Sequence, residues 1–181
     1  MKLYLKQSLT TLLLLGSVAI ASADTCTSIP GSVTCASGII EGLVGNGMVN
    51  VDGTTINGTA IINGQLNAEG AHFSMLNVMG TANLSQCTVN DIATIKGLMT
   101  ASATKFQRSV DVYSTAVRFS NCDINGDVHM HHSDAEKQIV YLDKKSVVSG
   151  NIIFDDGEGK VVVRGHSKIG GKVIGGLVSR K

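Results

Sequence analysis

The segment DVHMHH contains three histidines close together in the chain. Side chains alternate between the two faces of a β-strand, so His129 and His131 would lie on the same face. Two imidazoles on one face are suitable ligands for a divalent metal ion, and Asp127 or Asp134 could supply a third ligand. The polar residues that follow, HSDAEKQ, are typical of an exposed loop instead. We favour the loop, so no metal site is assigned, and the candidate metal ligands are His129, His131 and His132.

A second polar feature is the acidic segment DDGEG, which lies between two apolar runs. It contains Asp155, Asp156 and Glu158, whose carboxylate oxygens are of the kind that calcium prefers. The spacing of an EF-hand loop is absent, so a solvated turn is favoured over a calcium site. His72 and His166 are isolated in the sequence and are interpreted as surface residues.

Motifs of the common enzyme classes are absent from the sequence. The chain contains no GxSxG, HExxH or phosphate-binding loop motif. Acidic residues are scattered through the segment 42–120, unlike the clustered carboxylates of pectate-lyase-like β-helices. With 15 basic and 14 acidic residues, the chain lacks the excess positive charge on which nucleic-acid binding depends. We therefore expect a protein that is not an enzyme, has no cofactor and binds no nucleic acid.

These side chains must be positioned by a repeating fold, because a short pattern, apolar–any–Gly–any–apolar, recurs along the chain. The regular positions are Gly64, Gly80, Gly97 and Ser114, at intervals of 16, 17 and 17 residues. Other positions keep step in the series Leu76, Ala93, Val110 and Val128; Val78, Ile95, Val112 and Met130; and Cys87, Thr104 and Cys122. Near the C-terminus the period is longer, since Ser146 aligns with Ser167, 21 residues later.

A period of about 16–21 residues, rich in β-branched residues, predicts an all-β fold. We expect a single-domain parallel β-solenoid, with a right-handed coil, in which each coil holds two or three short strands. The alternative is an antiparallel β-sandwich, with strands every 8–12 residues or so. The long register and the lack of two-residue hairpin turns favour the solenoid. Its expected bounds are residues 40–178, after an N-terminal segment or cap at 24–39.

The first 23 residues have the features of a cleaved secretory signal peptide. Lys2 and Lys6 precede an apolar run, and Ala21-Ser22-Ala23 fits the small-residue cleavage rule. We expect residues 1–23 to be removed, leaving no stable membrane span, although an uncleaved anchor is the alternative. The protein is then expected in the periplasm or outside the cell.

The four cysteines all follow the expected cleavage site and match no zinc or redox motif. Cys26 and Cys35 are close in sequence and precede the regular coils, so we expect them to form a disulfide. Cys87 and Cys122 would lie two coils apart, at about 9.6 Å, which is too far for a disulfide. The repeat therefore predicts that Cys87 and Cys122 do not pair unless the ladder is offset between them.

The units SVVSGNI and SKIGGKV resemble the repeats of the bactofilin family of polymer-forming β-solenoids. The resemblance extends over residues 40–175 or so and implies a right-handed parallel β-helix that joins end to end into filaments. Bactofilins act from the cytoplasmic side of the cell envelope, whereas this chain has an export signal and four cysteines. The resemblance thus concerns the architecture and not the location.

From these features we expect an exported, non-catalytic structural or scaffolding protein of the cell envelope. The alternative is a secreted adhesin or effector-like module that binds a component of the envelope or of a host surface. Self-association through the last coil, residues 168–178, is expected, because neither a helix nor a polar capping repeat covers it.

Overall fold

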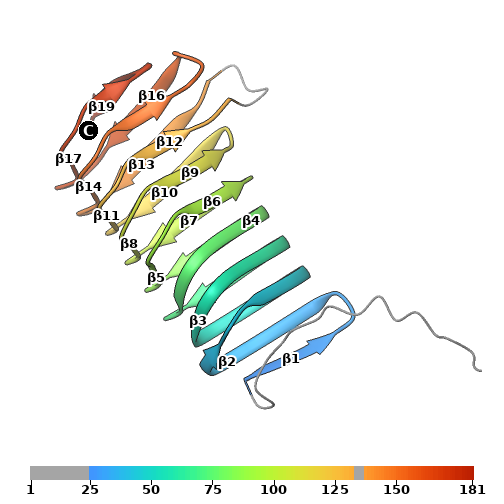
Figure 1. The fold of residues 1–181 in the computed structure, drawn as a ribbon. Coiled ribbons are helices and arrows are strands. Elements are labelled where there is room, and N and C mark those ends of the chain that lie inside the picture. Colours follow the sequence, from blue (N-terminus) through green and yellow to red (C-terminus); the bar gives the residue numbers. More distant parts are fainter. Residues whose placement is uncertain (1–24, 133–136) are drawn as a thin grey trace, which may run out of the picture.

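The computed structural model describes residues 25–132 and 137–181, and the predicted signal peptide lies outside them. The strands stack as the coils of a parallel β-solenoid, which confirms the predicted fold class (Figure 1). The described residues form no helix, so none of their segments is a helix able to cross a membrane.

The N-terminal coils consist of long strands that bend around the corners of the solenoid. These are β1 (Cys26–Ile29), β2 (Ser32–Ile40), β3 (Leu43–Glu69) and β4 (His72–Ser85). One strand, β4, pairs with three later strands in turn, namely β5, β6 and β7. A single coil therefore contributes to three sheet faces.

From β5 onward each coil is divided into three short strands, one on each face, and all neighbouring strands within a face are parallel. Face 1 contains β7 (Met99–Ser102), β10 (Ala116–Ser120), β13 (Ile139–Asp143), β16 (Gly159–Val163) and β19 (Gly176–Arg180). Face 2 contains β5 (Thr88–Val89), β8 (Lys105–Phe106), β11 (Asp123–Ile124), β14 (Val147–Val148) and β17 (Lys168–Ile169). Face 3 contains β6 (Ala93–Lys96), β9 (Val110–Tyr113), β12 (Val128–Met130), β15 (Ile152–Phe154) and β18 (Val173–Ile174).

The core fills the inside of the coils, because alternate residues of each strand point inward and stack on their equivalents. On Face 1 one inward row contains Val117, Val140 and Val161, all buried. Phe106 and Phe119 are buried and meet edge to face, with ring centroids 5.9 Å apart. Phe73 lies in the core as well, since its ring is not exposed to solvent.

One corner of the solenoid is lined by small residues that we call the corner ladder; its members are Cys87, Thr104, Cys122, Ser146 and Ser167. A hydroxyl in this ladder accepts a hydrogen bond from the main chain of the coil before it. The amide of Cys87 donates to the Thr104 hydroxyl at 3.3 Å, and the amide of Cys122 to the Ser146 hydroxyl at 3.2 Å. These hydroxyls replace part of the backbone pairing that is lost where the chain turns.

One coil is longer than the sequence predicted. Equivalent corner residues are 17 apart between Cys87 and Thr104, but 24 apart between Cys122 and Ser146. The upper limit of 21 residues was therefore wrong for this one coil. Its extra residues lie between β12 and β13, around the segment 133–136, so the strands on either side keep their register.

The two ends of the solenoid differ. At the N-terminal end β1 runs antiparallel to β2, and a disulfide joins Cys26 to Cys35, as the sequence predicted. Cys87 and Cys122 are both free thiols, which also agrees with the prediction. At the C-terminal end β17, β18 and β19 form the last coil of the described residues, and each pairs with a strand of the coil before it.

Candidate functional site

The histidine run lies on Face 3, where β12 is flanked by β9 and β15. His129 pairs in register with Asp111 of β9 and with Ile153 of β15. Met130, between the two histidines, points into the core and is buried. His129 and His131 therefore share the outer face, and both side chains are partly exposed. The expectation that these residues form a loop was wrong for residues 129 and 130, which belong to β12.

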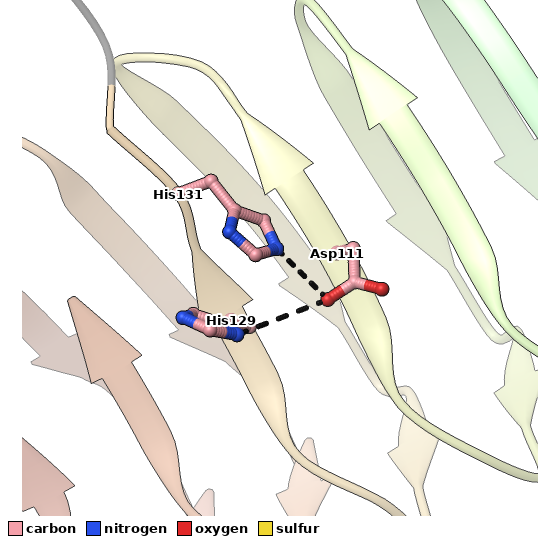
Figure 2. Close-up of side chains that lie close together, drawn as sticks. All are labelled: Asp111, His129 and His131. Atoms are coloured by element: carbon pink, nitrogen blue, oxygen red, sulfur yellow. Dashed lines mark hydrogen bonds and ion pairs between the residues drawn. The ribbon is translucent and has the colours of Figure 1, made fainter. Parts of the chain in front are cut away.

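Asp111 approaches both histidines from the neighbouring coil (Figure 2). Its Oδ1 lies 3.1 Å from Nε2 of His131 and 4.0 Å from Nδ1 of His129. One ligand atom from each of these three residues falls within 4.8 Å of the others. Among the described residues, Asp111, His129 and His131 are the cluster that could hold a metal ion.

Asp155 contacts the same histidines from the coil on the other side. It follows β15 directly, in the acidic turn, and its Oδ1 lies 2.6 Å from Nε2 of His129. Its Oδ2 lies 3.2 Å from Nδ1 of His131. The hydrogen bond from His129 is the main cause that holds the pKa of Asp155 below its ordinary value, and His131 acts in the same direction. Two carboxylates thus face the pair of imidazoles, one from each neighbouring coil.

Aromatic contacts restrict the orientation of the histidine rings. Tyr113 stacks on His131, with centroids 4.3 Å apart and planes 15° apart. The rings of His131 and His129 are 3.9 Å apart and tilted by 32°. On the coil that precedes that of Tyr113, the ammonium group of Lys96 lies 5.4 Å from the centre of the Tyr113 ring. The row Lys96, Tyr113, His131 therefore fixes one side of the cluster.

The main chain at His131 is fixed by a buried glutamine. Gln138 begins the approach to β13 and is 2% exposed. Its Nε2 donates to the carbonyl oxygen of His131 at 2.7 Å and to that of Ser114 at 3.0 Å. The chain on either side of the segment 133–136 is thus tied together next to the cluster.

Of the predicted site residues, the structure brings together only some. His132 pairs with Asp156 instead of joining the other histidines. Asp127, a suggested third ligand, accepts a hydrogen bond from the amide of Asn151 at 2.6 Å and is not in the cluster. Asp134, the other suggestion, lies outside the described residues. His72 and His166 are exposed, as expected.

The sequence analysis missed Asp111 and treated Asp155 as part of a separate acidic turn. The turn itself is present, since residues 155–157 follow the end of β15. Its first carboxylate, however, belongs to the histidine cluster. Register was the information that could have found Asp111, because it lies one coil away from the histidines and not beside them in sequence.

The last coil is a second surface of interest. Val178 continues the inward row of Val161, yet it is 44% exposed. A hollow of about 440 Å³ at this end is lined by Ile169, Val173, Gly176, Leu177, Val178 and Arg180, among others. Inward-facing apolar side chains thus lie open to solvent at the C-terminal end of the described residues.

Comparison with protein-family models, with curated proteins and with solved structures finds no match for this chain.

Proposed function

We propose that this protein is an exported, non-catalytic structural solenoid of the cell envelope that associates with a second copy through its last coil. The observation that supports this is the exposure of Val178, which continues a row of buried valines. Within the described residues, nothing covers the outer edges of β17, β18 and β19. Their unpaired backbone groups and apolar side chains would be satisfied by the edge of another chain.

The different ends of the solenoid favour a closed pair. β1 runs antiparallel to β2, whereas β19 is parallel to β16, so the two ends present strand edges of different polarity. Where β1 covers residues 32–35 of β2, a head-to-tail stack would therefore not continue the parallel pairing. Contact between two C-terminal coils uses the same surface twice, which is the geometry of a two-fold dimer.

The location is part of the same proposal. A disulfide between Cys26 and Cys35 is compatible with an oxidising compartment, where such bonds persist. Fractionation of cells that produce the protein tests this directly. Retention in the envelope supports the scaffolding role, whereas release into the medium supports the alternative, a secreted surface-binding module.

Light scattering on the purified protein, over a concentration series up to high micromolar, tests the association. The expected result is a mass that rises from one chain to two and then stays constant. Val178→Lys should keep the mass at one chain, because a charge would be buried in the contact. Its matched control is Ile61→Lys, since Ile61 is 41% exposed but belongs to β3, in the N-terminal coils.

Circular dichroism and thermal unfolding of both variants show whether the solenoid is intact. If the wild-type protein remains a single chain at all concentrations, the association proposal is wrong and the surface-binding alternative is favoured. If Ile61→Lys prevents association as well as Val178→Lys does, the contact does not lie at the last coil.

A further inference from the structure

We propose that Asp111, His129 and His131 form a binding site for a divalent transition-metal ion, with Zn²⁺ as the representative ion. The site goes beyond the structural role proposed above and does not depend on it. It would join β9 to β12 on the outer surface of Face 3. The ligand atoms would be Oδ1 of Asp111, Nδ1 of His129 and Nε2 of His131.

The ligand atoms lie near the separations that such an ion requires, all within 4.8 Å of one another. Zinc binds imidazole nitrogen and carboxylate oxygen at about 2.0–2.1 Å, so two ligands of a tetrahedral ion are about 3.3 Å apart. Asp111 Oδ1 lies 3.1 Å from the nitrogen of His131 and 4.0 Å from that of His129. The separation to His131 is near the required value, whereas the separation to His129 exceeds it, so the His129 ring would have to turn toward the ion. Three protein ligands leave a fourth position open for water.

Asp155 supplies the second requirement of a metal site. A histidine ligand usually donates its other ring N–H to a carboxylate, which orients the ring and increases its basicity. Asp155 accepts from Nε2 of His129 at 2.6 Å and lies 3.2 Å from Nδ1 of His131. These are the two nitrogens that the metal would not use. Asp155 therefore fixes both imidazoles in the orientation that points their other nitrogens toward Asp111.

The ligand set also indicates the class of ion. Imidazole nitrogen suits zinc, copper, nickel and iron, whereas calcium and magnesium prefer sites made of oxygen ligands. With two imidazoles and one carboxylate, the cluster should discriminate against calcium and magnesium. Tyr113, stacked on His131, shields one side of the ring and limits the loss of side-chain freedom on binding.

Isothermal titration calorimetry with ZnCl₂ on chelator-treated, untagged protein tests the site. The wild-type protein should bind one Zn²⁺ ion per chain and should not respond to CaCl₂ or MgCl₂. The double variant His129→Ala/His131→Ala should lose this binding. Asp155→Asn should keep the stoichiometry but weaken the affinity about 10–100-fold, because it removes only the support of the rings.

The matched control is His72→Ala/His166→Ala, which removes two exposed histidines elsewhere and should leave binding unchanged. Thermal unfolding with and without Zn²⁺ gives a second readout. The metal should raise the unfolding midpoint of the wild type and of the control, but not that of His129→Ala/His131→Ala. Without metal, the wild type and the His72→Ala/His166→Ala control should unfold at similar temperatures, since these two side chains are exposed. The proposal would be overturned if the wild type bound no Zn²⁺. It would also be overturned if the His72→Ala/His166→Ala variant lost Zn²⁺ binding while the His129→Ala/His131→Ala variant kept it.

Discussion

Cys87 and Cys122 lie on the same corner of the solenoid, two coils apart, and Thr104 lies between them in the ladder. Each thiol lies near a main-chain oxygen of its own turn, Ser85 for Cys87 and Ser120 for Cys122. Each also lies near one of the preceding coil, Ala68 for Cys87 and Ala101 for Cys122. The two thiols therefore have the position that serine hydroxyls have in the later coils. Both are buried, so solvent does not reach them.

The first prediction concerns thiol reactivity. Iodoacetamide should modify Cys87 and Cys122 very slowly in the folded protein and rapidly in denaturant, because both are buried and burial raises the pKa of each thiol. Mass spectrometry after timed quenching measures the two rates. Rapid labelling of either residue under native conditions would show that its corner opens readily.

The raised pKa values also predict how stability depends on pH. The unfolded chain would release its thiol protons near pH 8.5 or so, whereas the folded chain retains them at higher pH. The contribution of the thiols is therefore fully present below that pH and lost as the pH rises through the folded pKa. Urea unfolding of the wild type from pH 7 to 10 should show this loss. The variant Cys87→Ser/Cys122→Ser should show less of it, because serine does not titrate there.

The second prediction concerns the row of glycines that precedes Face 1. Gly80 has a φ of +134°, and a Cβ at this position would collide with the carbonyl oxygen of Gly64 on the previous coil. Gly80→Ala should therefore reduce the free energy of unfolding by about 3 kcal/mol or more. Gly157→Ala is the control, since nothing lies within 4 Å of its Cβ position at a φ of +76°. It should cost only about 1–2 kcal/mol, and an equal loss in both variants would mean that the contact with Gly64 is unimportant.

The third prediction concerns Gln138. Gln138→Leu keeps most of the side-chain volume but removes the donor to the carbonyl oxygens of His131 and Ser114. Since both acceptors lie next to the core, the free energy of unfolding should fall by about 1–3 kcal/mol. Urea denaturation measures the change, with Lys137→Gln as the exposed neighbouring control. If the two variants are equally stable, water replaces the lost donor at no cost.

The fourth prediction concerns the disulfide at the N-terminal end. Cys26→Ser/Cys35→Ser should lower the free energy of unfolding by about 2–3 kcal/mol, the value expected for closing a loop with a sequence separation of nine. Reduction of the wild type with dithiothreitol should have the same effect, and should have none on the double variant. A larger loss in the variant than on reduction would mean that the serines themselves disturb β1 and β2.

Regular spacing made most of the fold predictable from the sequence. The series through Val110 and Val128, and the alignment of Ser146 with Ser167, both appear as observed pairs or ladder contacts. The glycine pattern was more ambiguous. Gly80 and Gly97 lie between Face 3 and Face 1, whereas Gly126 and its later equivalents lie between Face 2 and Face 3. The same short pattern thus occurs at two different corners, because any sharp turn between inward apolar residues favours it.

The histidine cluster was only half predictable. His129 and His131 share a face because side chains alternate in a strand, which the sequence shows directly. Asp111 lies between Val110 and Val112, which the repeat already aligned with Val128 and Met130, so the register contained this neighbour as well. Asp155 could not be placed in this way, since the coil that leads to it has the irregular length of 24 residues.

The open last coil has a consequence for motion as well as for assembly. In a solenoid each coil is stabilised by its neighbours, and within the part of the chain that the structure describes β17, β18 and β19 pair with strands on one side only. Their amides should therefore exchange with solvent deuterium fastest, through openings that release one coil at a time. Protection should increase toward the middle of the chain, where each coil is held on both sides. Among the described strands, opening would then begin at β17, β18 and β19 and proceed one coil at a time, without a change in the core of the remaining coils.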